Sequence, residues 1–360
     1  MDGLSTTTNN ATQPANWQIH RSTGPIVALI PAYNEERFIG KALENLAGQY
    51  PSQSYEIILV DGGSTDRTRE VIAEFQQSHP ELAIRVLDNP QRTIPHGLNL
   101  GIAAASGEII ARIDAHAVPS RGYIRRCVEV LSEGEAEVVG MPCRVQPGAD
   151  TVMARAIAIA VSHPFGIGDA KYRLEQGREL QEEVDTVAFA CFRKSLWADL
   201  GGYDEKLLTN EDYDFNYRVR ARGDRVLLDR SQHCDYFART TLAKLAAQYL
   251  RYGTWKARMV RQRPRSIKVR HLVAPMFVVS IVLLMALGFW RSLAWESLAL
   301  ELAVYLMAAI GFSYQATQKA HASLRVMLAM PAAFLTIHFC WGASFLMGLV
   351  RTPQLRNRIS

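Results

Sequence analysis

The 360-residue sequence predicts an α/β domain with a doubly wound parallel sheet, followed by apolar helices that enter a membrane. Two observations support this fold class. In the first half of the chain, short β-branched apolar runs alternate with amphipathic segments about every 30 residues, which is the spacing of βαβ units. In the last quarter, three apolar stretches approach or exceed the roughly 20 residues that a membrane-spanning helix needs.

Four strands are expected to alternate with three helices in the first third of the chain. Apolar and β-branched residues dominate the strands, and apolar side chains recur at helical spacing between them. The predicted strands cover residues 25–31, 55–60, 84–87 and 107–113, and the helices cover 34–46, 68–77 and 96–105. Ligands bind at the carboxyl ends of the strands in open α/β sheets, so that edge is the expected site.

Acidic residues follow two of these strands at the same edge of the sheet. Asp61 precedes a Gly-Gly-Ser-Thr-Asp loop, and Asp114 follows the fourth strand with His116 two residues later. If that strand continues through them, Asp114 and His116 point to the same side. A carboxylate beside an imidazole can hold Mn²⁺ or Mg²⁺ together with phosphate oxygens and water, whereas the simpler alternative is a solvated turn. The glycine signatures of dinucleotide folds and P-loops do not follow the first strand.

A second acidic group lies later in the chain. Residues 184–190 predict a buried strand, and residues 209–218 begin as a polar segment and continue as a helix. Glu211, Asp212 and Asp214 lie at the start of that helix. Acids in this position are favoured by the helix dipole, so simple helix stabilisation is the alternative to a chemical role.

The three apolar stretches cover residues 272–290, 297–314 and 326–350. The first contains no charged residue and predicts a membrane-spanning helix. The second contains Glu301, so a re-entrant or interfacial helix is the alternative there. The third contains Pro331 and His338, which a packed membrane helix tolerates.

The formal charge of +5 is concentrated before the first apolar stretch. Residues 251–270 contain eight Lys or Arg and no Asp or Glu, which predicts a multi-pass protein of the inner membrane with its N-terminal domain in the cytoplasm. A nucleic-acid site is the weaker interpretation because a membrane helix follows. Three crossings would put Arg351, Arg356 and Arg358 outside, whereas two crossings and a re-entrant segment would keep them inside.

Composition also suggests the domain boundaries. Residues 1–24 are polar, lack the apolar core of a signal peptide and predict a disordered arm. The five cysteines show no CxxC or zinc spacing and predict free thiols, mostly in the core. We expect a main domain over 25–240, a basic juxtamembrane segment over 241–271, a membrane domain over 272–350 and a basic tail over 351–360.

Three motifs in sequence order resemble those of family 2 inverting glycosyltransferases, which have the Rossmann-like GT-A fold of nucleotide-diphospho-sugar transferases. They cover residues 31–36 (PAYNEE), 60–66 (VDGGSTD) and 114–116 (DAH). The resemblance implies that Asp61 hydrogen-bonds a base, typically uracil, in a nucleoside pocket lined by Ala32, Tyr33 and Glu35. It also implies that Asp114 and His116 match the DxD metal motif, with His in place of the last Asp.

His233 is a third candidate ligand for the divalent cation, Mn²⁺ or Mg²⁺. It lies in the loop after an apolar run near residues 226–228, from which it could reach the metal. A structural role is the alternative, because a lone histidine is more often structural than a ligand.

The acidic helix start resembles the ED motif of the family, which implies that Asp212 is the catalytic base. Glycosyl transfer needs a carboxylate that takes the proton of the acceptor hydroxyl. Glu211 and Asp214 would then position the acceptor or the helix.

A later segment resembles the QxxRW motif of processive family members, with Tyr252 in place of Trp. Two or three spans can hardly build the channel that processive synthesis needs, so one sugar per encounter is expected. Gln248, Arg251 and Trp255 would share one helix face and close over the diphosphate. The alternative is an amphipathic helix that lies on the membrane.

A closer resemblance, to the succinoglycan-biosynthesis (ExoA-type) branch, covers roughly residues 25–275. Its motifs lie at residues 165–173, 184–187, 216–218 and 248–253. It implies transfer of a sugar, commonly glucose from UDP-glucose, onto a lipid-diphosphate-linked saccharide during exopolysaccharide synthesis. The implied partners are a UDP-sugar donor, a lipid-linked saccharide acceptor and membrane lipid. The alternatives are a polyprenyl-phosphate sugar transferase and a non-catalytic membrane scaffold with the same fold.

Overall fold

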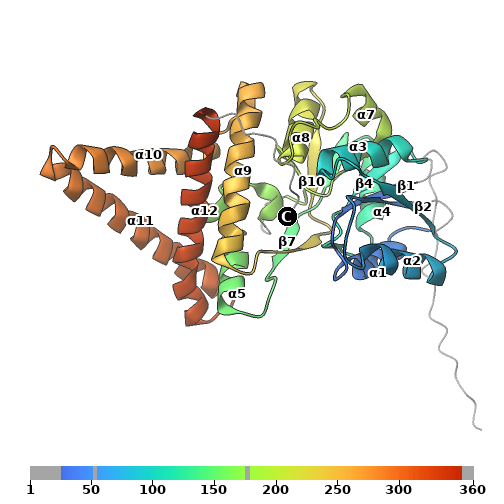
Figure 1. The fold of residues 1–360 in the computed structure, drawn as a ribbon, viewed down its shortest axis with the longest axis horizontal. Coiled ribbons are helices and arrows are strands. Elements are labelled where there is room, and N and C mark those ends of the chain that lie inside the picture. Colours follow the sequence, from blue (N-terminus) through green and yellow to red (C-terminus); the bar gives the residue numbers. More distant parts are fainter. Residues whose placement is uncertain (1–25, 52–54, 175–178, 351–360) are drawn as a thin grey trace, which may run out of the picture.

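The computed structural model describes residues 26–51, 55–174 and 179–350. The arm expected over residues 1–24 and the basic tail over 351–360 lie outside the described residues. Figure 1 shows an α/β domain at one end of the molecule and a group of long helices at the other.

The first half of the large sheet is parallel, as the sequence predicts. β1 lies between β2 and β4, and β3 pairs with the outer side of β2. These strands are β1 (Ile26–Ala32), β2 (Tyr55–Asp61), β3 (Ala83–Asp88) and β4 (Ile109–Arg112). The helices that connect or follow them are α1 (Ile39–Ala47), α2 (Thr68–Ser78), α3 (Ile94–Ala104) and α4 (Tyr123–Glu133).

The second half of the sheet is mixed, so the prediction of a wholly parallel sheet is wrong there. β9 runs antiparallel to both of its neighbours, β4 and β6, and β8 runs antiparallel to β10. These strands are β6 (Val138–Gly140), β8 (Gln181–Glu183), β9 (Cys191–Arg193) and β10 (Val226–Asp229). α7 (Lys194–Asp199) and α8 (Glu211–Ala221) follow β9.

Residues 184–190 do not form the predicted strand. The two ends of this segment bond to strands, since the Val184 amide donates to Val226 of β10 at 2.9 Å and the Ala190 carbonyl accepts from Arg112 of β4 at 3.0 Å. Between these ends, side chains of α8 take the place of a strand: Asn216 donates to the Val187 carbonyl at 3.1 Å, and Arg220 donates to the Asp185 carbonyl at 3.0 Å. Phe189 has a left-handed φ of +51°, which a strand cannot contain. The apolar side chains of this segment are buried, which is why the sequence resembles a strand.

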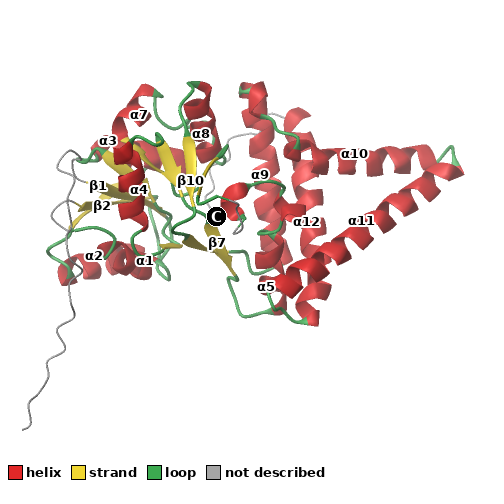
Figure 2. Cartoon of the chain, turned by 180° about the vertical axis from the view of Figure 1, so that it is seen from behind, coloured by secondary structure: helices red, strands yellow, loops and turns green. Residues whose placement is uncertain are grey.

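Helices cover both faces of the sheet (Figure 2), and an apolar cluster lies on each face. On one face, α1, α2 and α4 pack against the strands, and on the other α3, α7 and α8 do so. Four of the five cysteines are buried and the fifth is partly buried, and all five are free thiols, as predicted.

A small sheet connects the α/β domain to the helices. It contains β5 (Ala117–Pro119), β11 (Cys234–Phe237) and β7 (Cys143–Gln146), with β11 in the middle. Beside it lie α5 (Val152–Ala160), the short α6 (Pro164–Ile167) and the 3₁₀ turn η2 (Lys171–Arg173). α9 (Leu242–Gln262) follows β11, and the 3₁₀ turn η3 (Pro264–Ser266) follows α9.

The last three helices are each long and apolar enough to cross a membrane. They are α10 (Arg270–Gly288), α11 (Ser292–Lys319) and α12 (Leu324–Val350), close to the predicted stretches. Figure 1 shows that α10 and α11 project away from the domain and meet at their far end, whereas α12 lies alongside α9. Glu301 of α11 accepts a hydrogen bond from Ser280 of α10, so the one acid of the second stretch is bonded within this pair.

Candidate active site

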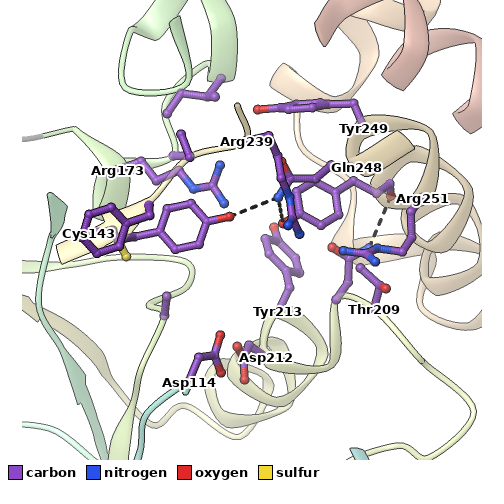
Figure 3. A pocket seen from close by; sticks show the side chains of 18 of the residues that line it. Asp114, Cys143, Arg173, Thr209, Asp212, Tyr213, Arg239, Gln248, Tyr249 and Arg251 are labelled. Carbon is purple, nitrogen blue, oxygen red and sulfur yellow. Dashed lines mark hydrogen bonds between the residues drawn. The ribbon is translucent and has the colours of Figure 1, made fainter. Parts of the chain in front are cut away.

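A cavity of about 1750 Å³ lies between the carboxyl ends of the central strands and α9. Its walls come from the α/β domain, the small sheet, α9 and the start of α10 (Figure 3). Most of the predicted site residues line it: Ala32, Tyr33, Glu35, Asp114, His116, Glu211, Asp212, Gln248 and Arg251. The structure thus brings together motifs that are far apart in the sequence.

Arg112 is the centre of the acidic end of this cavity, and the sequence analysis did not identify it. It is the last residue of β4, its side chain is 5% exposed, and one of its amino groups lies 3.0 Å from Asp114 and 3.4 Å from Glu211. The other amino group pairs with Asp212. Burial disfavours its charge, but the surrounding carboxylates raise the pKa of Arg112 above its ordinary value. An arginine within an otherwise apolar strand is the sequence signal that could have found it.

Asp212 has two differently placed carboxylate oxygens. Arg112 holds Oδ2, whereas Oδ1 is buried and has no hydrogen-bond partner among the described residues. A buried oxygen without a partner is unusual in a native protein and is suited to receive a proton from a bound hydroxyl. Its neighbour Glu211 is buried as well, and burial raises the pKa of Glu211 despite the opposing charge of Arg112.

Asp114 and His116 reach the cavity from a turn, not from a strand. β4 ends at Arg112, and the Ala117 amide donates to the Asp114 carbonyl at 3.0 Å, so the expected extension of the strand through both residues is wrong. Nδ1 of His116 lies 3.2 Å from Oε1 of Glu35. Burial opposes the charge of His116, but the Glu35 contact and the charge of Asp114 raise its pKa above the ordinary value.

This pair fits a divalent cation that takes its other ligands from a substrate. A carboxylate on Nδ1 fixes the imidazole with Nε2 free, which is the usual arrangement of a metal-binding histidine. Among the described residues no group of three or more His, Cys, Asp or Glu side chains could hold a metal. Phosphate oxygens and water would supply the other ligands of a cation bound by this pair. His233 does not line the cavity; its backbone pairs with Ser120.

The loops after β1 and β2 hold each other in place. Asn34, at a φ of +55°, accepts a hydrogen bond from the Thr65 amide at 2.8 Å, and the Glu35 amide donates to Thr68 at 2.8 Å. Asp61 is fully buried, accepts hydrogen bonds from Ser64 and pairs with Arg69 at 2.6 Å.

Asp61 is not among the residues that line the cavity. The described contacts therefore give it a loop-holding role, and its hydrogen bond to a base stays a prediction.

α9 supplies the opposite wall. Gln248 donates hydrogen bonds to the hydroxyls of Tyr236 at 3.2 Å and Tyr252 at 2.9 Å. Gln248, Arg251 and Trp255 all line the cavity, so the three residues share one helix face as expected.

Asp214, by contrast, is fully buried and pairs with Arg218 at 2.7 Å and with Arg263. It ties α8 to the end of α9 and does not line the cavity. Of its two expected roles, the structure supports positioning of the helix.

Comparisons with known proteins agree with this geometry. The family model described as glycosyl transferase family 2 matches residues 27–200. The chain is 27% identical to the succinoglycan biosynthesis protein ExoA of Rhizobium meliloti over 94% of this chain and 98% of that protein. It is also 27% identical to a dolichyl N-acetylglucosaminyl phosphate diacetamidodideoxyglucuronosyltransferase of Methanococcus voltae, over 66% of this chain and 74% of that protein.

A solved structure shares the fold. The mannosyltransferase PcManGT of Pyrobaculum calidifontis, solved with GDP-mannose and Mn²⁺, superposes with a TM-score of 0.57 at 20% identity, over 87% of this chain and 85% of that one. Sequence motifs, sheet topology, apolar helices and these relatives agree. Residues 27–200 form a glycosyltransferase family 2 domain, and the protein is a membrane-associated glycosyltransferase of polysaccharide or glycan synthesis with the GT-A fold.

Proposed function

We propose that this enzyme transfers a single sugar, glucose from UDP-glucose, to a lipid-diphosphate-linked saccharide with inversion at the anomeric carbon. The observation that carries the proposal is the Asp212 carboxylate, with one oxygen held by Arg112 and the other buried and without a partner beside the cavity. The similarity to ExoA along almost the whole of both chains supports the exopolysaccharide context.

The reaction is a single displacement. Oδ1 of Asp212 takes the proton of the acceptor hydroxyl, and the hydroxyl oxygen forms a bond to the anomeric carbon. The bond from that carbon to the donor phosphate breaks on the opposite face, and its electron pair leaves with the nucleoside diphosphate. Arg112 holds the base in position, and Glu211 pairs with the same arginine. The displacement involves no covalent enzyme intermediate.

Asp114 and His116 are the residues that would hold a divalent cation, and Glu35 orients His116. The cation would neutralise the donor diphosphate and make it a better leaving group. Ala32, Tyr33 and Glu35 lie where a nucleoside would enter, beside the mutually bonded loops after β1 and β2. The Mn²⁺ in the PcManGT structure supports the same use of the fold.

We place the catalytic domain in the cytoplasm and the apolar helices in the inner membrane. The basic residues of α9 and of the segment up to the start of α10 support this orientation. α10 and α11 meet at their far end, which supports two crossings, and α12 packs along α9, which supports a position at the membrane surface. A C-terminal reporter fusion tests the topology: a cytoplasmic signal is expected, and a periplasmic signal would overturn it.

The test of function is release of UDP by purified, detergent-solubilised protein from a panel of nucleotide sugars, with Mn²⁺, Mg²⁺ or EDTA. EDTA-sensitive release from UDP-glucose is expected. A product whose sugar is acid-labile and bound through one phosphate would indicate a polyprenyl-phosphate sugar transferase instead. No release and no nucleotide binding would indicate a non-catalytic scaffold.

A further inference from the structure

The cavity has a basic and tyrosine-rich end that the reaction described above does not use. Arg173, Arg239 and Tyr249 face this end, opposite Asp114 and Asp212 (Figure 3). They come from η2, from the residues after β11 and from α9. Arg173 belongs to one of the sequence motifs, but the sequence alone suggests no role for it.

Arg173 is a partly buried cation that is paired with no anion among the described residues. Its guanidinium lies 5.6 Å from the ring centre of Tyr172 and 5.7 Å from that of Tyr236, inside a shell of tyrosines. Within residues 26–51, 55–174 and 179–350, no carboxylate pairs with it and no side chain or carbonyl accepts its hydrogen bonds. Buried charges are normally paired, and the open side of this one is the cavity. The missing partner is therefore expected to be an anion that a ligand brings.

The neighbouring hydroxyls are arranged as donors. Gln248 donates one hydrogen bond to Tyr236 and another to Tyr252, so each phenol oxygen is already an acceptor and keeps its own hydrogen for a further partner. Arg239 lines the same space as a second cation. Guanidinium groups bind phosphate with two parallel hydrogen bonds, and phenols add single ones. This chemistry matches a phosphate or a diphosphate.

The cavity continues from this basic end to the apolar helices. Val273, Ala274 and Phe277 of α10 and Ile337 of α12 line it together with the residues described above. A ligand in this position would have its anionic group at Arg173 and an apolar chain against helices suited to a membrane. A soluble diphosphate would leave that apolar wall without a partner.

We propose that Arg173 and Arg239, with the hydroxyls of Tyr236 and Tyr252, bind the phosphate or diphosphate of a polyprenyl-linked acceptor, whose chain lies against the cavity-lining residues of α10 and α12. This inference rests on the proposed function and adds the acceptor site to it. The donor diphosphate belongs beside Asp114 and His116. The two phosphate sites adjoin, because the ring centre of Tyr236 lies 6.2 Å from that of His116.

The first test measures binding of farnesyl diphosphate, farnesyl phosphate, inorganic pyrophosphate and farnesol to the full-length protein in detergent by titration calorimetry. Farnesyl diphosphate or farnesyl phosphate should bind more tightly than pyrophosphate or farnesol. Arg173→Gln should weaken that binding by roughly tenfold or more, the usual effect of losing a charge-assisted bidentate contact. Arg265→Gln removes the same charge from an exposed site outside the cavity and should leave binding unchanged.

If Arg173→Gln does not fold, two other variants replace it. Arg173→Lys keeps the positive charge but loses the planar guanidinium group, and Arg239→Gln removes the second cation. Unchanged affinity in all folded variants would overturn the site. Equal binding of pyrophosphate and farnesyl diphosphate would overturn the lipid assignment and leave a free-diphosphate site.

A second measurement separates this inference from the proposed function. Arg173→Gln should raise KM for the lipid acceptor and leave both KM for the nucleotide sugar and its slow hydrolysis unchanged. If Arg173→Gln turns over with an unaltered KM for the lipid acceptor, the acceptor site is wrong but the proposed function is not. Arg173-dependent binding of farnesyl diphosphate without turnover of any nucleotide sugar would overturn the function but not the site.

Discussion

The two halves of the cavity are built in different ways. The N-terminal half comes from the loops after β1, β2 and β4, and its parts bond to one another through side chains such as Asn34 and Asp61. The C-terminal half comes from η2, α8, β11 and α9, which are joined by ion pairs and tyrosine contacts across long sequence separations. Local sequence therefore determines the first half, whereas the second depends on packing of the whole chain. Arg112 of β4 links the two halves.

The strongest test of this division is Asp212→Asn. If the chemistry lies in the C-terminal half and nucleotide binding in the N-terminal half, turnover should fall by a factor on the order of 10²–10⁴, the usual contribution of a general base. Nucleotide binding, measured by calorimetry, should not change. Asp199→Asn, an exposed change outside the cavity, is the control. Survival of turnover in Asp212→Asn would remove the base assignment.

Arg112→Gln tests the link between the halves. It leaves Asp114, Glu211 and Asp212 without their shared cation, and breaking such a buried pair typically costs about 3–5 kcal/mol of unfolding free energy. Loss of the positive charge raises the pKa of the remaining carboxylates, so the acidic limb of the pH–rate profile should move to higher pH. Arg112→Lys should have an intermediate effect on stability and on the pH–rate profile, because the point charge of an ammonium cannot replace the planar guanidinium group. If Arg112→Gln has the stability and the pH–rate profile of the wild type, contacts other than those of Arg112 connect the two halves of the cavity.

Gly253→Ala tests how the C-terminal half is attached to the apolar helices. A Cβ at Gly253 would lie 2.2 Å from Ser344 Oγ and 2.4 Å from the Trp341 carbonyl of α12. Overpacking of this kind costs about 1–3 kcal/mol, visible as a lower melting temperature. Gly311→Ala in α11, where a Cβ would meet nothing within 4 Å, is the matched control and should not destabilise the protein. Equal effects of the two changes would contradict the close contact between α9 and α12.

Lys256 makes the C-terminal half sensitive to pH. Burial, helped by the charge of Arg270 and opposed by Asp185, lowers the pKa of Lys256 to about 7, and its ammonium lies 3.5 Å from the ring centre of Tyr213. Between about pH 7 and the ordinary lysine pKa near 10.4, the unfolded chain binds a proton that the folded chain does not. Stability should therefore rise with pH across that window.

Thermal melting from pH 6 to pH 9, roughly the lower part of that window, measures this effect. In Lys256→Met, which lacks the titrating ammonium group, the melting temperature should rise less with pH than in the wild type. The same slope in wild type and variant would show that Lys256 stays charged in the folded protein.

The contrast between the halves also explains what the sequence could predict. The first four strands were predictable because buried parallel strands are continuous apolar runs, and all four lie within a residue or two of the expected positions. The apolar helices were predictable from the length and the apolar composition of three stretches. Residues 184–190 were not, because side chains of α8 replace the strand partners that the apolar pattern suggested.

Individual site residues follow the same division. Asp114, His116 and Glu35 come from motifs at strand ends and line the cavity as expected. Arg112 and Arg173 were missed, because what makes them unusual is burial among carboxylates in one case and among tyrosines in the other. That environment exists only after the chain has folded.

The glycine contacts between α9 and α12 have a geometric consequence. Gly253 lies against Ser344, and Gly348 lies against Ala257, so neither helix can slide along the other without a clash. α9 carries the wall that faces Asp212, and α12 is one of the three apolar helices. The distance between the carboxylate of Asp212 and the surface of the apolar helices is therefore constant. An acceptor anchored in that surface would be selected by the reach of its saccharide as well as by its chemistry.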